Sequence, residues 1–284
     1  MKIQPVRGTH DIYGQKLYNF KIFENAVNKF AQIYDFKEII TPIFESTDLF
    51  KKPLGENSDV VLKEMYTFLD RNDSSLTLRP EYTTPMIRAA ISNNFLSKLP
   101  QKLYGIGPMF RRERPQKGRY RQFNQMNFEI LGTNDISADI DLILLAQRIL
   151  KELLLDKKVE LHINSLGDKN TLTLFKKALS IYFNKFKRDL SDDSLKKILS
   201  NPLRILDSKN SKDQDICKNA PQIFEFYSKE ADEKFSNIQK YLSSLSVNFK
   251  INSSLVRGLD YYCHTVFEFK TNDLGSQGTL IGGG

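Results

Sequence analysis

The hydrophobic pattern near the start of the chain predicts a long helix followed by a strand. Apolar side chains recur at helical spacing through residues 17–36, which predicts an amphipathic helix with one buried face. The next segment, Lys37–Glu45, predicts a strand, and Pro42 within it cannot donate a hydrogen bond to a neighbouring strand. We therefore expect this strand to lie at an edge or at an interface.

A hairpin and a second helix are expected next. Residues 65–69 and 76–78 flank a turn rich in Asn, Asp and Ser, which predicts two paired strands. A helix is expected over residues 84–94, and the turn before it would present Glu81 and Thr83 beside the first helical N–H groups. A threonine in this position is by itself typical of a helix N-cap.

The alternation that begins at Phe123 gives a strand one unusually polar face. A period of two places Phe123, Gln125, Asn127 and Glu129 on one face and mostly apolar residues on the other. Glutamine, asparagine and glutamate beside an aromatic ring suit hydrogen bonding to a small polar ligand. A solvated strand face is the alternative interpretation, and the strand taken alone leaves both open.

Helical segments dominate the second half of the chain. An apolar helix is expected over residues 138–155 and a strand over residues 159–163. Helices rich in Lys, Ser and Asn follow over residues 167–248, and the last of them is expected to span Pro221–Leu245. Strand alternation returns over residues 263–270. We interpret the helical stretch as a domain inserted between two halves of a sheet.

Length, composition and charge narrow the class of protein. A chain of 284 residues with 40% hydrophobic content can bury a full core and predicts one large domain plus a smaller one. The formal charge of +8 favours anionic partners such as nucleotides or nucleic acid. The N-terminus has no apolar signal, and no apolar run is long enough to cross a bilayer. We expect a cytoplasmic protein with no membrane contact.

Cysteine and histidine spacing argues against a metal centre or a disulfide framework. Cys217 and Cys263 lie far apart in sequence, and we expect both to be free thiols. His264 and Glu268 have a spacing of four in a segment that predicts a strand, too far apart for one metal ion to bridge. Because no glycine-rich phosphate loop follows a strand, phosphate binding would depend on arginines.

Those arginines are concentrated in one loop. Residues 111–121 contain six cationic side chains and one carboxylate, with Pro115 and Gly118 marking a turn. The loop leads directly into the polar strand that begins at Phe123. A basic loop joined to a polar strand face favours a binding site for a polyanion, although a basic surface turn is the alternative.

The same stretch resembles a known family. An Arg-x-Glu opening, a basic loop and a following Phe resemble motif 2 of class II aminoacyl-tRNA synthetases, and RRERPQKGRYRQF with Gln125 and Glu129 resembles the histidyl-tRNA synthetases. Farther along the chain, Arg257-Gly-Leu-Asp-Tyr-Tyr262 resembles the histidine-specific motif of that family. The segment NPLRILDSK at residues 201–209 also resembles sequences of that family, so the resemblance extends over essentially the whole chain.

The resemblance implies a fold and a domain organisation. The expected fold class is α+β, a class II synthetase antiparallel sheet flanked by helices, with an inserted helical domain. Residues 1–168 would form the first part of the catalytic domain, 169–249 the insertion, and 250–284 its continuation. The segment around Pro42 would be motif 1, which implies a homodimer. The family continues with motif 3 and an anticodon-binding domain, so we expect a truncated catalytic region with impaired activity on its own.

The resemblance also implies a reaction, in which the carboxylate of histidine attacks the α-phosphate of ATP and histidine then passes to the 3′ end of histidine tRNA. Two arginines would reduce the repulsion between these anions. Magnesium is expected with ATP, but its ligands cannot be named. The implied catalytic residues are Arg257 and Arg111; the histidine-binding residues are Glu81, Thr83, Gln125, Glu129, Tyr261 and Tyr262; and the ATP-binding residues are Arg111, Glu113, Arg119, Arg121 and Phe123.

Two alternatives belong to other classes of protein. A non-catalytic synthetase-like paralogue would act as a regulatory subunit of histidine biosynthesis, and a general RNA-binding protein would explain the positive charge. The joint presence of Arg111, Gln125, Glu129, Arg257 and Tyr262 argues against the paralogue, because a binding module has no need for two arginines at an α-phosphate. An RNA-binding protein would not explain the polar strand face.

Overall fold

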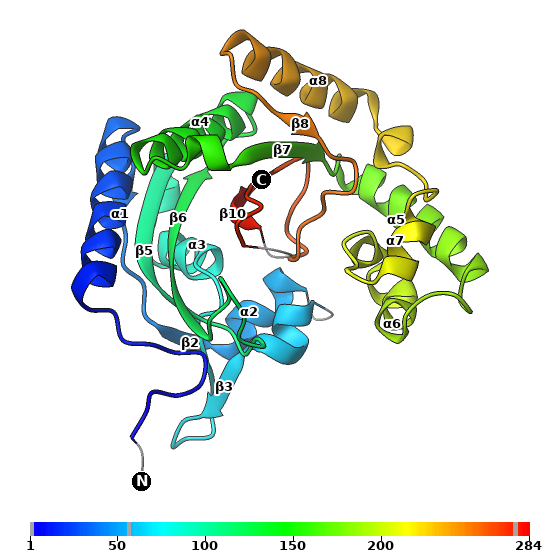
Figure 1. Ribbon diagram of the computed structural model, residues 1–284. Coiled ribbons are helices and arrows are strands. Elements are labelled where there is room, and N and C mark those ends of the chain that lie inside the picture. The colour runs from blue at the N-terminus through cyan, green and yellow to red at the C-terminus, as the bar shows by residue number, and fades with distance from the viewer. Residues whose placement is uncertain (1–2, 56–57, 275–277) are drawn as a thin grey trace. The chain divides into compact units, whose positions relative to one another are not determined.

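The chain forms two compact units, Met1–Lys157 and Lys158–Gly284. The computed structural model describes residues 3–55, 58–274 and 278–284. Helices and strands occur in both units, as the α+β class predicts (Figure 1).

The main sheet of the first unit is built on a long antiparallel pair, β5 (Gln101–Phe110) and β6 (Gln122–Leu131). The short strand β1 (Lys37–Glu38) adds to β5 in parallel, which gives the order β1-β5-β6. The basic loop connects β5 to β6. The strand predicted from Phe123 is therefore confirmed.

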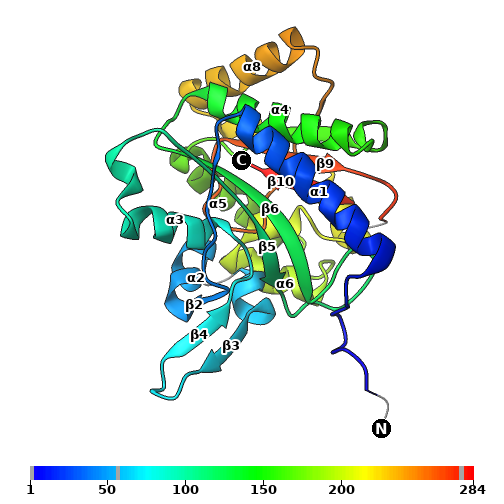
Figure 2. The same ribbon diagram turned by 90° about the vertical axis from the view of Figure 1, so that its left-hand side faces the viewer.

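Helices pack on the two faces of this sheet. Figures 1 and 2 show α1 (Gly14–Ile33) and α4 (Ile136–Glu152) on one face and α3 (Thr83–Ser92) on the other. The apolar face of β6 buries Met126, Phe128 and Ile130 against a core that contains side chains of α1 and α4. On the opposite face, α3 packs over β5 through a core that includes Met86 and Met109. The polar face of β6 thus belongs to the α3 side.

A second small sheet of the first unit contains the predicted hairpin. Its order is β2-β4-β3, with β2 at Phe44–Ser46, β3 at Tyr66–Leu69 and β4 at Ser75–Leu78, all antiparallel. The single strand expected over Lys37–Glu45 is wrong in one respect. It is two strands, because the segment around Pro42 leaves the β5 ladder after Glu38 and joins a different sheet at Phe44. Shorter elements complete the unit: α2 (Thr47–Leu54), a π-helical turn (Val60–Glu64) and a 3-10 turn at Phe95–Ser97. A further 3-10 turn, Asp156–Lys158, includes the boundary between the two units.

The second unit has a four-stranded sheet of order β10-β9-β7-β8. The central strands β7 (Glu160–Ser165) and β9 (Thr265–Lys270) are antiparallel. The outer strand β10 (Thr279–Gly283) is antiparallel to β9, and β8 (Lys250–Ile251) is parallel to β7. Between β7 and β8 the chain forms α5 (Lys169–Lys185), α6 (Asp192–Ser200), α7 (Ser211–Cys217) and α8 (Lys229–Ser244), with 3-10 turns at Pro202–Ile205 and Ile223–Phe226.

The helices of residues 169–244 share a core with the strands of this unit. Phe175, Leu179 and Phe183 of α5 are buried in one cluster with Ile198 of α6 and Val266 of β9. The helices expected as an insertion therefore pack with β9, and the division at 168 and 249 stays a prediction.

The helix expected over Pro221–Leu245 begins later than predicted. The chain forms a 3-10 turn, is extended at Tyr227, and starts α8 only after Ser228. The Ser228 side chain accepts a hydrogen bond from the Ala231 N–H at 3.2 Å and so caps the helix. The Tyr227 hydroxyl donates to the Ser165 carbonyl at 2.8 Å. A hydrogen bond to a distant strand end thus fixes the break, and helical periodicity does not reveal it.

The N-termini of α5 and α8 are joined by their caps. Asp168 accepts the Thr171 N–H at 2.7 Å and also the Ser228 hydroxyl at 2.5 Å. These hydrogen bonds, led by the one from Ser228, lower the pKa of Asp168 to about 2. One carboxylate therefore connects two helices that begin 60 residues apart in sequence.

Candidate functional site

The polar face of β6 lies beside two glycines of β5. Gly107 is opposite Gln125 in the antiparallel register. A Cβ atom on Gly107 would lie 2.3 Å from Nη2 of Arg79, and one on Gly105 would lie 2.4 Å from the ring of Tyr82. The two glycines therefore let the segment before α3 pack directly on the sheet. This close approach brings the start of α3 to the polar face.

Arg79 holds this segment in place from within the core. Its side chain is fully buried, and it donates hydrogen bonds to the carbonyls of Pro108 and Thr41, each at 2.9 Å. The guanidinium also lies over the ring of Tyr82, 4.2 Å from the ring centroid. Its role here is structural. The sequence signal for it was a charged residue at the end of a strand, immediately before a proline.

Glu81 caps α3 with both of its oxygens. Oε2 accepts from the N–H of Thr83 and Oε1 from the N–H of Thr84, each at 2.9 Å. Burial raises the pKa of Glu81, although these hydrogen bonds and Arg111 act in the opposite direction. The interpretation of Thr83 as a simple N-cap is therefore wrong, because Thr83 is the first helical residue and the carboxylate before it satisfies the helix N–H groups.

Thr83 instead directs its hydroxyl to the polar strand. It donates to Oε1 of Glu129 at 2.5 Å, across 46 residues of sequence. Asn127 donates its amide to the same oxygen at 2.7 Å. Burial raises the pKa of Glu129 to about 7, whereas the two hydrogen bonds lower it and the nearby Glu81 raises it. The structure thus brings three predicted residues, Glu81, Thr83 and Glu129, into one cluster.

The basic loop has an ordered interior around Glu113. Its carboxylate lies 2.6 Å from Nη1 of Arg119 and 3.9 Å from Nη1 of Arg111. The Arg121 side chain donates to the Glu113 carbonyl at 3.4 Å. The side chains of Arg112 and Arg114, by contrast, are exposed. The four predicted ATP-binding residues of the loop therefore form one group.

Arg111 connects the loop to the Glu81 turn. Its Nε donates to the carbonyl of Pro80 at 2.8 Å, and its guanidinium lies 5.3 Å from the ring centroid of Phe123. The turn before α3, the loop and the first residue of the polar face are thus held together. Gln125 shares this face of β6.

The second unit holds the other predicted residues. Nη1 of Arg257 donates to Oε1 of Glu268, and its guanidinium lies 5.3 Å from the ring centroid of Tyr262. The rings of Tyr261 and Tyr262 are 4.7 Å apart. Burial acts to lower the pKa of Arg257, but Tyr262 and Glu268 outweigh it and the pKa is raised. The guanidinium therefore keeps its charge in a largely buried position.

The loop at residues 201–204 packs against the Arg257 motif. Asn201 donates to the carboxylate of Asp260 at 3.1 Å. A Cβ atom on Gly258 would lie 3.3 Å from Nη1 of Arg204. The two segments that carried the resemblance in this half of the chain are therefore in contact.

Comparison with known proteins identifies the family. Residues 8–284 match the family model described as histidyl-tRNA synthetase. The chain belongs to this family. A curated histidine–tRNA ligase of Wolbachia pipientis subsp. Culex pipiens is 50% identical over 284 residues, which are 100% of this chain and 69% of that protein. That of Ehrlichia chaffeensis is 47% identical, with 100% and 68% covered.

Solved structures of histidyl-tRNA synthetases share the fold. The apo enzyme of S. aureus is 34% identical, with a TM-score of 0.78, and the match covers 100% of this chain and 66% of that one. A Bacillus halodurans structure titled as an ATP phosphoribosyltransferase regulatory subunit/histidyl-tRNA synthetase has a TM-score of 0.70 at 19% identity, covering 97% and 74%. At that identity the likeness shows the fold alone. The α+β fold of a class II synthetase is confirmed.

Two residues of this synthetase fold were missed by sequence reasoning. Asn127 was placed on the polar face but given no role. Glu268 is buried on β9. A carboxylate between Phe267 and Phe269 in an otherwise apolar strand was the sequence signal that could have found it. It binds Arg257 through one oxygen, while its other oxygen accepts from the Thr279 hydroxyl at 3.0 Å.

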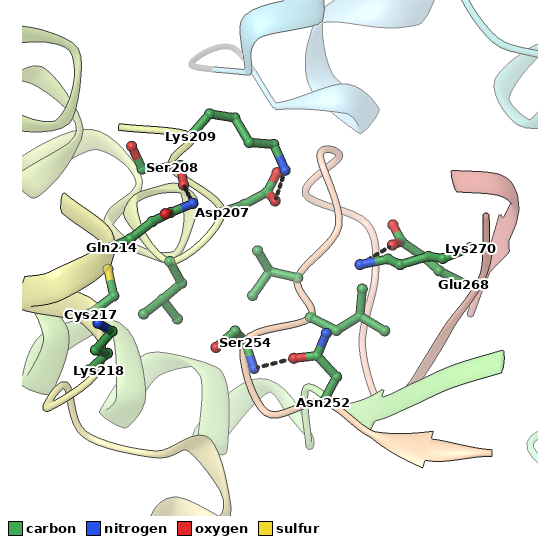
Figure 3. A pocket seen from close by; sticks show the side chains of 13 residues that line it. Asp207, Ser208, Lys209, Gln214, Cys217, Lys218, Asn252, Ser254, Glu268 and Lys270 are labelled. Atoms are coloured by element: carbon green, nitrogen blue, oxygen red, sulfur yellow. Dashed lines mark hydrogen bonds and ion pairs between the residues drawn. The ribbon is translucent and has the colours of Figure 1, made fainter. Parts of the chain in front are cut away.

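A polar pocket lies beside Glu268 in the second unit (Figure 3). It has a volume of about 280 Å³ and is lined by parts of residues 206–218, by Asn252, by residues 254–256 and by Glu268 and Lys270. Two ion pairs line it, Lys209 with Asp207 at 3.5 Å and Lys270 with Glu268 at 3.0 Å. Because Glu268 also binds Arg257, the pocket and this arginine share one carboxylate.

Among residues 3–55, 58–274 and 278–284, no group of three or more His, Cys, Asp or Glu side chains is placed to hold a metal ion. Cys217 and Cys263 are free, as expected. Burial raises the pKa of Cys217 to about 11, which makes its thiol unreactive. No helix in the described part of the chain is long and apolar enough to span a membrane.

Proposed function

We propose that the protein is an ATP-dependent histidine–tRNA ligase and that this chain carries its catalytic region. One observation carries the proposal: a chain up to 50% identical to curated histidine–tRNA ligases keeps both a cluster of Glu81, Thr83 and Glu129 and a largely buried, charged Arg257. Curated relatives at this identity favour the ligase over the regulatory paralogue.

In the proposed reaction, a carboxylate oxygen of histidine attacks the α-phosphorus of ATP, and pyrophosphate leaves to give histidyl-adenylate. The 3′-terminal hydroxyl of the tRNA then attacks the histidyl carbonyl, and AMP leaves. Arg111 and Arg257 would hold the α-phosphate and offset the repulsion between the two anions. Both guanidiniums are held by hydrogen bonds, Arg111 to Pro80 and Arg257 to Glu268, so little reorganisation is needed.

Histidine would be recognised at both ends. Glu81 and Thr83 would bind the α-ammonium, with Gln125 near the same end of the substrate. Glu129 and Tyr262 would bind the imidazole, and Tyr261 would lie beside that ring. Support comes from charge and position, since a carboxylate suits an ammonium, and a second carboxylate suits a ring N–H.

ATP would bind along the basic loop. Phe123 would stack on adenine, Glu113 would lie near the adenine amino group, and Arg119 and Arg121 would reach the distal phosphates. Within this proposed site Arg119 is paired with Glu113 through Nη1, at 2.6 Å. Magnesium enters the proposal as the ion that accompanies ATP and bridges its phosphate oxygens.

The proposed activity is tested by histidine-dependent ATP–pyrophosphate exchange on the protein in its full natural length. Arg257→Ala should lower the exchange rate by about a hundredfold to a thousandfold. Arg114→Ala, which removes an exposed cation of the same loop as Arg111, serves as the matched control and should leave the rate nearly unchanged. No histidine-dependent exchange by the unchanged protein would refute the ligase assignment, and full activity of Arg257→Ala would refute the role of that arginine.

We also propose a homodimer, formed through the segment around Pro42. Three apolar side chains there are exposed in the single chain: Ile40 at 79%, Phe44 at 53% and Ile43 at 44%. Such a group is typical of a protein interface. Sedimentation of the protein should give a dimer, and Ile40→Lys with Phe44→Lys should give monomers. A monomer at micromolar concentration before any substitution would contradict this proposal.

The other partners and the compartment follow from the ligase assignment. Histidine, ATP and histidine tRNA are the proposed substrates, and the cytoplasm is the proposed location because translation occurs there. The excess of positive charge supports tRNA binding.

A further inference from the structure

The two hydrogen bonds donated to Glu129 end on the same oxygen. The Thr83 hydroxyl and the Asn127 amide both reach Oε1, at 2.5 Å and 2.7 Å. One donor comes from α3 and the other from β6, the strand of Glu129 itself. Two donors from separate elements fix the rotation of the carboxylate better than one would.

A carboxylate held in this way offers a ligand one oxygen. An ionised carboxyl group has about four lone-pair sites, and Oε1 already uses both of its own. In the part of the chain that the structure describes, no hydrogen bond ends on Oε2. A ligand N–H that approaches this carboxylate is therefore directed to Oε2.

Asn127 has further contacts that keep its amide in place. Its Nδ2 lies 3.3 Å from the sulfur of Met86 and 3.5 Å from the hydroxyl of Thr83. Its partner in the β5 register is Gly105, so no side chain of β5 lies directly across from it. Asn127 therefore lies between α3 and Glu129 and is hydrogen-bonded to both.

We infer that Asn127 is a positioning residue for recognition of the histidine ring. It holds Oε1 of Glu129 so that Oε2 accepts the single N–H of a neutral imidazole. This inference rests on the proposed binding of histidine by Glu129 and goes beyond it by giving Asn127 a role in discrimination. The amide acts through Glu129 and does not touch the substrate.

The proposed role depends on the hydrogen bond that the Asn127 amide donates and not on the shape of its side chain. Two variants separate these two properties. Asn127→Ala removes both the donor and the volume. Asn127→Asp keeps the shape and volume but replaces the donor with an acceptor that repels Glu129. If Asn127 only filled space, the Asp variant would behave like the unchanged protein.

Two ligands complete the experiment. Histidine has a ring N–H, whereas thiazolylalanine keeps one ring nitrogen as an acceptor but has no ring N–H. Calorimetric titration of each ligand into the protein in its full natural length gives a dissociation constant for every variant. Titration of ATP shows whether the rest of the site is intact.

The expected result is a selective loss of affinity for histidine. Both variants should weaken histidine binding by about tenfold to a hundredfold, as expected for a hydrogen bond to a charged group. Binding of thiazolylalanine and of ATP should change little. In exchange assays, the KM for histidine should rise while kcat stays nearly constant.

Three results would overturn the inference. If both variants bound histidine and thiazolylalanine with equally weakened affinity, the role of Asn127 would be merely structural. Normal histidine binding by Asn127→Asp would lead to the same conclusion. Unchanged histidine binding in both variants would remove any role. Failure of the proposed function is distinguishable, because the unchanged protein would then neither bind histidine nor support exchange, and the inference would fall with it.

Discussion

At the scale of single residues, the state of Glu129 is set by its surroundings. Burial raises its pKa to about 7, well above the ordinary value of 4.5 for a glutamate. The sequence showed that Glu129 lies on a polar face, because strand alternation is a local pattern. It did not show that Thr83 and Asn127 would share one oxygen of this carboxylate, because Thr83 arrives there only through the packing of α3.

The first prediction concerns pH. In the proposed site the ionised form of Glu129 is the stronger acceptor for a ring N–H, and this form is lost as the pH falls through about 7. The KM for histidine in pyrophosphate exchange should therefore fall as the pH rises from about 6 to about 8. Glu129→Gln cannot ionise, so its weaker binding should follow only the titration of the histidine ring itself. Identical pH profiles for the two proteins would contradict the assignment.

The second prediction concerns the glycine under Arg79. Gly107→Ala would place a Cβ atom 2.3 Å from Nη2 of this buried guanidinium, so one of the two must move. The free energy of unfolding in urea should fall by about 1–3 kcal/mol. In an Arg79→Met background the collision is relieved, and the same glycine substitution should cost much less. Additive costs in this double-mutant cycle would show that the contact is not the cause.

At the scale of elements, helix boundaries depend on caps that come from elsewhere in the chain. Helical periodicity predicted α1, α3 and α4 to within a few residues, because burial of one face repeats along each helix. It failed at the start of α8, where Ser228 and Asp168 form a hydrogen bond between two helix N-termini. Strand alternation did not predict β5 (Gln101–Phe110), because its two glycines weaken the pattern.

The third prediction concerns this cap. Asp168→Ala should lower the free energy of unfolding by about 1 kcal/mol at neutral pH, because the N–H of Thr171 loses its acceptor. Asp168→Asn keeps an acceptor and serves as the control.

The pH dependence of the same cap has a definite sign. The pKa of Asp168 is about 2 in the folded chain, below its ordinary value of 3.8. Its ionised form therefore stabilises the fold above about pH 4, and this contribution is lost as the pH falls toward about 2. In urea unfolding, the advantage over Asp168→Asn should disappear over that range. A constant difference would mean that the carboxylate charge has no part in the cap.

At the scale of the whole molecule, the net charge of +8 bears on association with tRNA. Counterion release makes the affinity of a basic protein for nucleic acid fall with salt. The exposed side chains of Arg112 and Arg114 place part of this charge on the outside of the basic loop. Composition predicted an anionic partner, but only the structure separates outward cations from those grouped around Glu113.

The fourth prediction concerns the salt dependence of tRNA binding. The double variant Arg112→Ala with Arg114→Ala should make the plot of log affinity against log salt concentration shallower by about 1.5. Lys16→Ala with Lys21→Ala removes the same charge from α1 and should leave the slope nearly unchanged. Filter binding of histidine tRNA at several salt concentrations measures both. An equal change in both variants would mean that only net charge matters.

The sequence by itself determined the family, the α+β class and the polar face of β6, and it supplied the two sets of proposed site residues. These depend on local periodicity and on motifs, which are properties of neighbouring positions in the chain. The tertiary structure alone decided that Glu81 caps α3, that Arg79 packs over Gly107, and that Glu268 binds Arg257. Each of these contacts depends on how two elements pack, and the hydrogen bonds of buried polar groups are settled only when their partners arrive.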